Sequence, residues 1–432
     1  MLVDTRADEE FLGWPASGQT RGGHIAGAVH LPWEWNLAAD GTLRPDDELK
    51  ALWTARGVTP DKEVALYSNA GTRAGFGYFA LRLLGYPRVA LYDGGMNEWS
   101  QAEAAAFPLK SAPRYATVVS AAWVKAVQDF HTPGTNAARP PTYNNNHAVI
   151  LETSWGVLSA AKDYNRGHVP GALHLDTDEF ENGYPRWHLK PLTKLQQVIG
   201  RYGITPETTV IVYSQQTIAA ARIWWVLNYA GVKDVRIFNG GYAAWQAAGF
   251  AGETAQQQAT TAPFSAPPRD EWLATTDYVR GRFDNGSVWL ADARSLAEYR
   301  GEASGYDYLA LRGRIPGALH IGDADDKARL YQDPDGTLRS FTEIEACWAE
   351  AGIKPAAGGD RFEREVIFYC GSGWRSSLTF LYAYLLGYGN IRNYSDSWSG
   401  WSTAYAQDAD EKGITPGWRQ APSANPIASG QP

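Results

Sequence analysis

The sequence predicts an α/β protein made of three tandem copies of one unit, each with a parallel sheet covered by helices on both faces. Short apolar strands alternate along the chain with segments of helical pattern, which requires crossover connections between parallel strands. Three stretches also resemble one another, and similarity at a regular spacing indicates a repeated unit. At 432 residues the chain is longer than a single hydrophobic core usually accommodates.

The clearest repeat is a strand followed by a loop and a helix. It reads V-A-L-Y-S-N-A-G-T-R-A at 64–74, V-I-V-Y-S-Q-Q-T-I-A-A at 210–220 and V-I-F-Y-C-G-S-G-W-R-S at 366–376. The first loop residue is Ser68, Ser214 or Cys370. In every copy a tryptophan follows 31 residues later, at Trp99, Trp245 and Trp401. This shared interval supports a true repeat.

Two further signatures precede each loop. A Gly-Ala turn that leads to a histidine occurs at 25–30, 169–174 and 315–320, and an apolar strand ending near an acid comes before it. In the first and third copies that strand ends in an Asp-x-Arg pair, Asp4 with Arg6 and Asp292 with Arg294. We interpret these pairs as structural, with the aspartate accepting backbone N–H groups and the arginine tying loops together. A catalytic role is the alternative.

Composition shifts divide the chain into domains at 1–110, 111–262 and 263–415, and predict a disordered tail at 416–432. Alanine-, glutamine- and proline-rich stretches at 101–116 and 252–269 are typical of connectors. The first copy has almost nothing before its acid-bearing strand, whereas the others have roughly 20 to 30 residues, enough for one more strand and helix. We therefore expect either a missing N-terminus or an incomplete first domain.

The composition excludes several protein classes. With 44% hydrophobic and 13% aromatic residues the chain is globular, and its net charge of −8 argues against nucleic-acid binding. The longest nearly apolar run, Leu378 to Tyr388, is too short to span a bilayer. Two cysteines exclude a disulfide framework and a cysteine-rich zinc site. No acid or cysteine recurs beside the paired histidines of the turns, so we expect no metal and no cofactor.

The loop of the third copy carries the chemistry. A thiol at the start of a glycine-rich loop before a helix meets inward-pointing N–H groups and the positive end of the helix, and Arg375 adds a full charge. We expect Cys370 to lie at the mouth of this loop as a thiolate, which is the nucleophilic form. A buried structural cysteine is the ordinary alternative. Cys347 lies in a helical pattern, where a half-buried position is favoured over a resolving thiol.

Other residues near this loop have two interpretations each. Arg375 could bind an anion or be structural, because Arg73 occupies the same position in the first copy. Trp374 could line a pocket, which we favour, or pack on a neighbouring domain. Three further arginines could place positive charge near the mouth for an anionic substrate, although an ordinary solvated arginine is the simpler interpretation of each: Arg300, Arg312 and Arg314.

These motifs resemble the rhodanese family: the Asp-x-Arg strand, the Gly-His-x-Pro-Gly-Ala turn, the cysteine loop and the Gly-Gly-x-x-x-Trp helix. The resemblance covers nearly the whole chain as three tandem rhodanese-like domains. It is greatest to the bacterial periplasmic three-domain thiosulfate sulfurtransferases, whose last domain carries a Cys-Gly-x-Gly-Trp-Arg loop. It implies that each domain is a small α/β unit with a mostly parallel five-stranded sheet and helices on both faces.

The resemblance also implies that the loop cysteine takes up sulfane sulfur as a persulfide and passes it to an acceptor. By position, Cys370 is the nucleophile and the persulfide cradle is Gly371, Ser372, Gly373, Trp374, Arg375 and Ser376. Serine is a poor nucleophile without a base, so the first two domains are predicted to be inactive. The third copy departs from the pattern at Arg314, where the others have histidine, and at Asp396-Ser397, where they have Gly-Gly.

We therefore predict a sulfurtransferase that moves sulfur from thiosulfate to a thiophilic acceptor, cyanide in vitro. 3-Mercaptopyruvate is an alternative donor, because the Gly-Ser-Gly loop lacks the basic residues that favour doubly charged thiosulfate. A persulfide carrier to a protein partner is another alternative. A Cys-based phosphatase or arsenate reductase is disfavoured, because four residues rather than five separate the cysteine from Arg375.

The expected partners are a small anionic sulfur donor and a thiol or cyanide acceptor, without nucleic acid or membrane, and we expect a monomer. By resemblance the protein is periplasmic, or cytoplasmic if the N-terminus is genuine.

Overall fold

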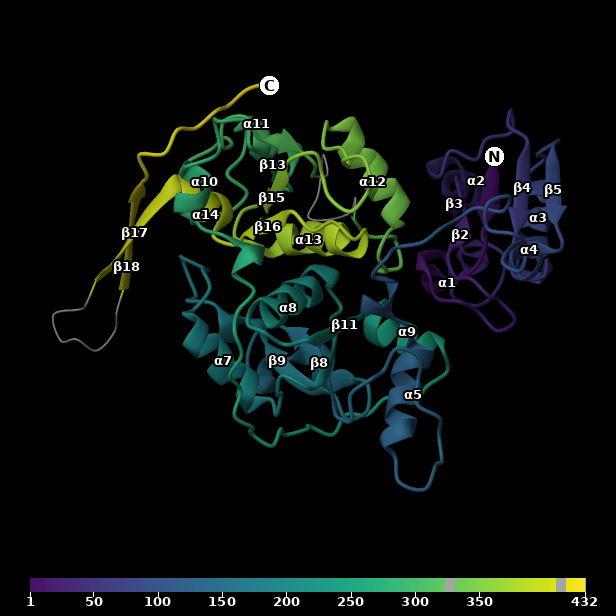
Figure 1. Ribbon diagram of the computed structural model, residues 1–432, viewed down its shortest axis with the longest axis horizontal. Helices are drawn as coiled ribbons and strands as arrows, with labels where there is room; N and C mark the ends of the chain where they lie inside the picture. The colour runs from purple at the N-terminus through teal and green to yellow at the C-terminus, as the bar shows by residue number, and fades with distance from the viewer. Residues whose placement is uncertain (323–330, 409–416, 432) are drawn as a thin grey trace. The chain divides into compact units, whose positions relative to one another are not determined.

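The computed structural model describes residues 1–322, 331–408 and 417–431 (Figure 1). The chain forms two compact units, Met1–Ala116 and Thr117–Pro432. The first contains one parallel sheet and the second contains two. Among the described helices, none combines the length and the apolar character needed to cross a membrane.

The first unit has a four-stranded parallel sheet in the order β3-β1-β4-β5. Its strands are β1 (Leu2–Asp4), β3 (Val29–His30), β4 (Val64–Tyr67) and β5 (Val89–Tyr92). The helices are α1 (Asp8–Leu12), α2 (Asp46–Ala55), α3 (Thr72–Leu83) and α4 (Gly95–Trp99), and β2 (His24–Ile25) pairs with β6 (Leu109–Lys110). Within residues 1–116 this sheet has four strands rather than the five that the family resemblance implies.

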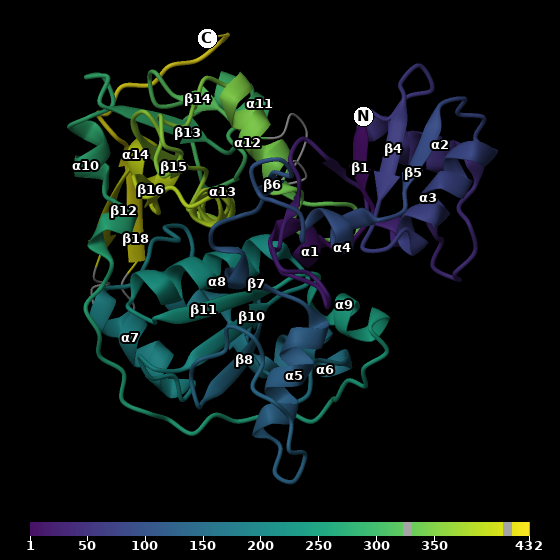
Figure 2. The ribbon, with the colours of Figure 1, turned by 45° about the vertical axis from the view of Figure 1, so that its right-hand side comes forward.

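The second unit begins with a five-stranded parallel sheet in the order β7-β11-β10-β8-β9, of which β7, β8, β10 and β11 are labelled in Figure 2. They are β7 (Val118–Val119), β8 (Ala148–Ser154), β9 (Leu173–Asp176), β10 (Thr209–Tyr213) and β11 (Asp234–Phe238). The helices are α5 (Ala121–His131), α6 (Lys162–Arg166), α7 (Leu192–Arg201), α8 (Thr217–Tyr229) and α9 (Gly241–Ala247). Every residue of β10 is buried, as expected of a central strand covered on both faces.

The third copy repeats this topology as β12-β16-β15-β13-β14. Its strands are β12 (Leu273–Ala274), β13 (Val288–Asp292), β14 (Leu319–His320), β15 (Glu365–Tyr369) and β16 (Ile391–Tyr394). The helices are α10 (Thr276–Arg280), α11 (Leu296–Arg300), α12 (Phe341–Glu350), α13 (Trp374–Leu385) and α14 (Ser397–Ser402). Short 3₁₀ turns occupy Trp33–Asn36, Tyr115–Thr117, Leu158–Ala160, Thr177–Phe180 and Asp270–Trp272. The two five-stranded sheets match the predicted repeat.

The C-terminal segment is ordered where the sequence predicted disorder. Strand β18 (Gly417–Pro422) pairs antiparallel with β17 (Thr403–Asp408). Beyond it, Ala428 forms a bridge with Arg314, and Ile427 packs against the core of the third copy. The predicted tail at 416–432 is therefore wrong for 417–431, because this polar composition still finds backbone partners; residues 416 and 432 lie outside the described residues.

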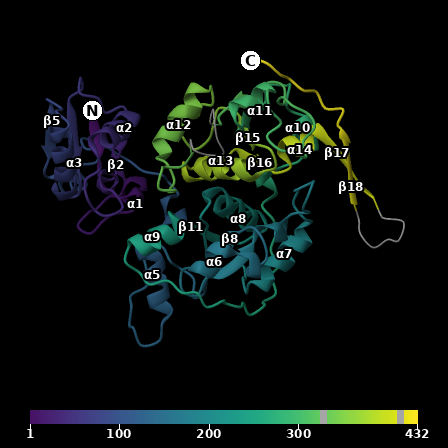
Figure 3. The ribbon, with the colours of Figure 1, turned by 180° about the vertical axis from the view of Figure 1, so that it is seen from behind.

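Helices α8 and α13 lie side by side between the two sheets of the second unit (Figures 1 and 3). Almost every side chain of each helix is buried, as expected of helices that are covered all round. Between them pack the aromatic rings of Trp224, Trp225, Trp272, Phe380 and Tyr384. The loop that begins α13 is consequently set against the second copy.

Candidate active site

Cys370 follows β15 directly and begins the loop that leads into α13. The loop turns at Gly373, whose φ of +92° is a left-handed conformation. A Cβ atom there would lie 2.4 Å from the carbonyl oxygen of Ser395, so only glycine fits. The Gly373 N–H donates a hydrogen bond to Cys370 Sγ over 3.2 Å. The predicted loop therefore forms around the sulfur.

The thiol is covered rather than placed at an open mouth. Cys370 is 0% exposed, and the ring of Tyr306 lies against Gly371, where a Cβ atom would come within 2.1 Å of it. This is the burial that the structural interpretation of the cysteine anticipated. The expectation that the thiol lies at the mouth of the loop is wrong, because the ring of Tyr306 covers the loop. No sequence motif includes Tyr306.

The surroundings nevertheless favour the thiolate. Burial acts to raise the pKa of the Cys370 thiol, but Arg375 and hydrogen bonds from Ser376 and the Ser372 N–H outweigh it and bring the pKa below its ordinary value. A buried cysteine with a lowered pKa is a candidate nucleophile.

Arg375 is held by a buried carboxylate. Its Nη1 and Nη2 donate to the two oxygens of Glu298 over 2.7 and 2.9 Å. Burial raises the pKa of Glu298, but this pairing outweighs it and lowers the pKa to about 2. In the first copy Arg73 pairs with Glu10 in the same way. Arg375 thus has the structural role that the sequence suggested and also supplies charge to the thiol.

Ser397 is a contact that the sequence motifs did not reveal. Its Oγ accepts a hydrogen bond from the Cys370 N–H over 3.0 Å and lies 3.9 Å from Sγ. Its φ is +51°, and the equivalent Gly95 and Gly241 have φ of +52° and +53°. The turn at Asp396-Ser397, where the sequence departs from the Gly-Gly pattern, is therefore preserved, with serine in a conformation that usually requires glycine.

Trp374 joins the loop to the second copy. Its Nε1 donates to Glu181 over 3.3 Å, and its ring stacks on Trp155 with centroids 4.9 Å apart. Burial raises the pKa of Glu181 to about 7, against the lowering effect of Arg222. Trp374 both packs on the neighbouring domain and lines a pocket, so the two interpretations left open for it hold together.

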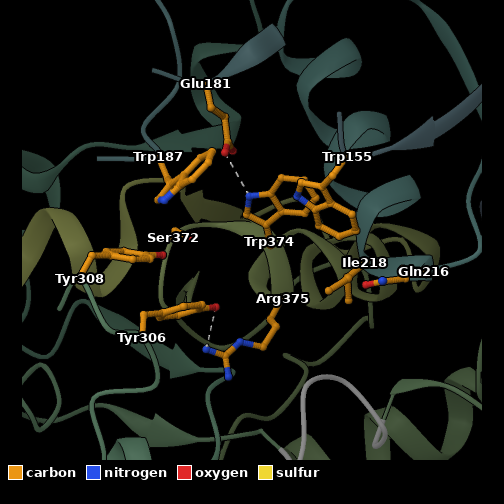
Figure 4. Close-up of a pocket in the computed structure, with 10 residues that line it drawn as sticks. All are labelled: Trp155, Glu181, Trp187, Gln216, Ile218, Tyr306, Tyr308, Ser372, Trp374 and Arg375. Atoms are coloured by element: carbon orange, nitrogen blue, oxygen red, sulfur yellow. Dashed lines mark hydrogen bonds between the residues drawn. The ribbon is translucent and has the colours of Figure 1, made fainter. Parts of the chain in front are cut away.

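The pocket beside the loop has a volume of about 310 Å³ and is shown in Figure 4. The second copy contributes Trp155, Glu181, Trp187, Gln216 and Ile218, and the third contributes Tyr306, Tyr308, Ser372, Trp374 and Arg375. Five of these ten residues are aromatic, and the one cation among them is paired with Glu298. Of this set, sequence reasoning identified only Ser372, Trp374 and Arg375. Gln216 and Ile218 lie in the serine loop of the second copy, which was predicted to be inactive, and the other five lie outside every repeated motif.

The three outlying arginines are not brought to this pocket. Arg300 and Arg314 line a different cavity, and Arg314 Nη1 donates to the carbonyl oxygens of Tyr299 and Gly430. Arg312 is exposed and donates to the Glu302 carbonyl. Their predicted effect on substrate is not supported, since backbone carbonyls of the third copy hold two of these guanidinium groups elsewhere.

The Asp-x-Arg pair has the geometry expected of a structural tie. Asp292 and Arg294 are fully buried, and Arg294 Nη2 donates to Asp292 over 2.6 Å and to the Gly313 carbonyl over 2.8 Å. Asp4 and Arg6 repeat these contacts in the first copy.

Cys347 lies half-buried on α12, as predicted. Within the described ranges, no group of three or more His, Cys, Asp or Glu side chains is arranged to hold a metal ion.

Comparison with known proteins gives the family. The model of the rhodanese-like domain matches residues 1–102, 145–248 and 275–404. Thiosulfate sulfurtransferase YnjE of Escherichia coli K12 is 31% identical over 413 residues, which cover 93% of this chain and 86% of YnjE. Sulfur carrier protein TtuD of Thermus thermophilus is 35% identical over 278 residues, 59% of this chain and 93% of TtuD.

Solved structures match the whole chain as well. The anaerobic ergothioneine biosynthesis enzyme of Chlorobium limicola, in complex with trimethyl histidine, superimposes with a TM-score of 0.84 at 28% identity and covers 100% of this chain and 95% of its own. EanB in complex with hercynine gives the same score and identity, and the match covers 94% of that chain. With three matched regions and a relative that spans nearly its full length, the chain belongs to the rhodanese family and contains three rhodanese domains in tandem.

Proposed function

We propose that the protein is a thiosulfate sulfurtransferase that carries sulfane sulfur as a persulfide on Cys370. The observation that carries the proposal is the environment of the sulfur: Gly373 N–H donates to Sγ over 3.2 Å, and the loop lowers the pKa of the thiol. The relatives named thiosulfate sulfurtransferase support this reaction. Sulfur transfer between small molecules is therefore the activity to test first.

The chemistry needs no added oxidant or reductant. The Cys370 thiolate attacks the outer sulfur of thiosulfate, a new S–S bond forms, and the old one breaks as sulfite leaves with the electron pair. An acceptor such as cyanide then attacks the outer sulfur of the persulfide, and the thiolate departs. The loop N–H groups and the start of α13 would stabilise the anionic sulfur in both steps.

The two serine loops are proposed to be inactive. Ser214 Oγ accepts a hydrogen bond from the Gln216 N–H, and Ser68 is buried. An alcohol at its ordinary pKa is a poor nucleophile without a positioned base. The second domain would instead support the third copy, through Trp155 and Glu181.

The test compares thiosulfate:cyanide transfer by the intact chain with that by Cys370→Ala. We expect the variant to lose transfer while keeping its melting temperature. Mass spectrometry after thiosulfate treatment should place one extra sulfur on Cys370 and none on Ser68 or Ser214. Full activity of Cys370→Ala would refute the site. Running 3-mercaptopyruvate in parallel ranks the two donors by kcat/KM.

A second candidate differs in the acceptor and is favoured by the pocket. Five aromatic rings line the site, and aromatic faces suit an organic cation. In the structures similar to this chain, the bound molecules include trimethyl histidine and ergothioneine. A small heteroaromatic betaine could therefore accept the sulfur here.

This transfer also balances. The outer persulfide sulfur enters a C–H bond of the heterocycle as a thiol, and the Cys370 thiol is restored. We would measure tryptophan fluorescence during titration with trimethyl histidine, then mass analysis of the product after the enzyme is loaded with sulfur. Binding with appearance of a product one sulfur heavier supports this acceptor. If the compound neither binds nor gains sulfur while cyanide is turned over, the acceptor is a different one.

A further inference from the structure

One buried arginine of the second copy reaches the sulfur-binding loop. Arg222, on α8, is 0% exposed. Its Nε and Nη2 donate to Glu181 Oε1 over 3.1 and 2.8 Å. Its Nη1 donates to the Gly373 carbonyl over 3.3 Å, and Nη2 also donates to Ser395 Oγ over 3.0 Å. A single guanidinium thus joins the serine-bearing domain to two segments of the cysteine-bearing one.

These contacts fall on the residue that controls the loop. Gly373 is the left-handed turn, and its N–H is the group bonded to Cys370 Sγ. The Gly373 carbonyl accepts hydrogen bonds from the N–H and the hydroxyl of Ser377, in the first turn of α13. A Cβ atom on Gly373 would lie 2.8 Å from Arg222 Nη1 and 2.4 Å from the Ser395 carbonyl oxygen. Arg222 and the Ser395 segment therefore confine Gly373 and hold its peptide groups in place.

The arginine is peculiar to this helix. Arg222 stands eight residues after Ser214, and the equivalent positions in the other copies are Phe76 and Leu378. Nothing in the shared fold therefore demands a cation here. By holding the Gly373 carbonyl, Arg222 keeps the Gly373 N–H directed at Cys370 Sγ, and a hydrogen bond to the anionic sulfur favours that form.

We propose that Arg222 is a positioning residue for the Cys370 sulfur: the domain that lacks a cysteine supplies the cation that fixes the Gly373 turn and favours the anionic sulfur. This inference rests on the proposed function, in which Cys370 reacts as a thiolate and persulfide. It also gives the second domain a specific task, since Glu181 in turn orients Arg222 and Trp374.

The test separates Arg222 from its partner. Arg222→Met alone would leave Glu181 buried without its cation, so the informative variant is Arg222→Met/Glu181→Gln, compared with Glu181→Gln. The glutamine oxygen can still accept from Trp374 Nε1. The readout is the ultraviolet absorbance of the Cys370 thiolate against pH, taken as a difference from the matching Cys370→Ser protein. This readout needs neither substrate nor turnover, so it does not depend on the proposed activity.

We expect the double variant to titrate about one pH unit higher than Glu181→Gln and to form the persulfide about tenfold more slowly at neutral pH, because its thiolate fraction falls. The control is Arg236→Met: Arg236 is buried in the second copy and pairs with Asp234, away from the loop. Arg236→Met should lower the melting temperature without changing the pH midpoint of the Cys370 titration. Equal midpoints for the double variant and Glu181→Gln would overturn the proposal.

If the double variant does not fold, Arg222→Lys decides the question. Lysine keeps the charge opposite Glu181 but cannot reach Glu181, Gly373 and Ser395 together. We then expect slower persulfide formation, with a melting temperature lowered no more than in Arg236→Met. A wild-type rate and a wild-type titration in Arg222→Lys would show that the contacts to the loop do not matter.

Discussion

Ser397 holds a backbone conformation that the other two copies assign to glycine. A left-handed conformation costs a residue with a side chain roughly 1 to 2 kcal/mol, so a serine there needs a compensating reason. Its Oγ gives the buried Cys370 N–H an acceptor and donates to the Tyr394 carbonyl over 2.7 Å. We interpret Ser397 as part of the structure that fixes the first residue of the loop.

Ser397→Gly should therefore separate stability from activity. The relieved backbone offsets the lost hydrogen bonds, which are worth about 1 kcal/mol each, so the melting temperature should change little. Transfer should fall by about tenfold, because the Cys370 N–H is left unpaired and the thiol is less well placed. The measurements are thermal melting and kcat/KM with thiosulfate.

Gly241→Ser is the matched control for this change. It places a serine at the same left-handed position of the second copy, where a Cβ atom would lie 3.0 Å from the Ser214 carbonyl oxygen. The control should lower the melting temperature and leave kcat/KM unchanged. If Ser397→Gly behaves like the control, Ser397 serves only the fold.

At the scale of elements, α11 and α13 are joined by the pair of Glu298 and Arg375. Glu298 also completes a capping box with Ser295 at the start of α11. Because the pKa of Glu298 falls to about 2 in the folded protein and is near 4.5 when unfolded, the unfolded chain binds more protons between these values. The pair therefore stabilises the fold above pH 4.5, by about 3 kcal/mol, and this contribution is lost as the pH falls toward 2.

Glu298→Gln should lower the urea midpoint at neutral pH and flatten its decline below pH 4.5, since the group that titrates there is gone. The control is Glu207→Gln, which removes an exposed partner of Lys233. It should leave the decline of the urea midpoint below pH 4.5 unchanged. If the urea midpoint of Glu298→Gln falls below pH 4.5 as steeply as that of the unchanged protein, the loss of stability in acid is due to other carboxylates.

The sequence predicted those parts of the site that are local in the chain. Cys370 and its loop follow a strand and precede a helix, and Asp292 and Arg294 are two residues apart, so each motif carries its own contacts. Tyr306 and Tyr308 lie in an irregular segment without periodicity, and they reach the loop only through the folding of the third copy. The sequence could not predict these two tyrosines because they are far from Cys370 along the chain.

At the scale of the whole molecule, the repeat predicted three α/β copies, but not that two of them would share one site. Trp155 and Glu181 belong to the second copy, and no feature near them in the sequence points to Cys370. The contacts between these two copies depend on how α8 packs on α13. Only the folded structure shows that both helices are buried on every side. The predicted boundaries at 110, 262 and 415 carry no information about this dependence.

Truncation tests the dependence directly. All ten residues that line the pocket belong to the unit Thr117–Pro432, so a fragment of residues 117–432 should fold and retain kcat/KM within about twofold of the full chain. Residues 263–432 alone keep the cysteine loop but lose Trp155, Glu181 and Arg222. They also expose the buried face of α13 and the rings of Trp272 and Phe380. This shorter fragment should aggregate, or lose at least about tenfold in transfer because its loop is unsupported. The checks are sedimentation, circular dichroism and thiosulfate:cyanide assays on both fragments. If residues 263–432 are monomeric and as active as 117–432, the second copy is not part of the active site.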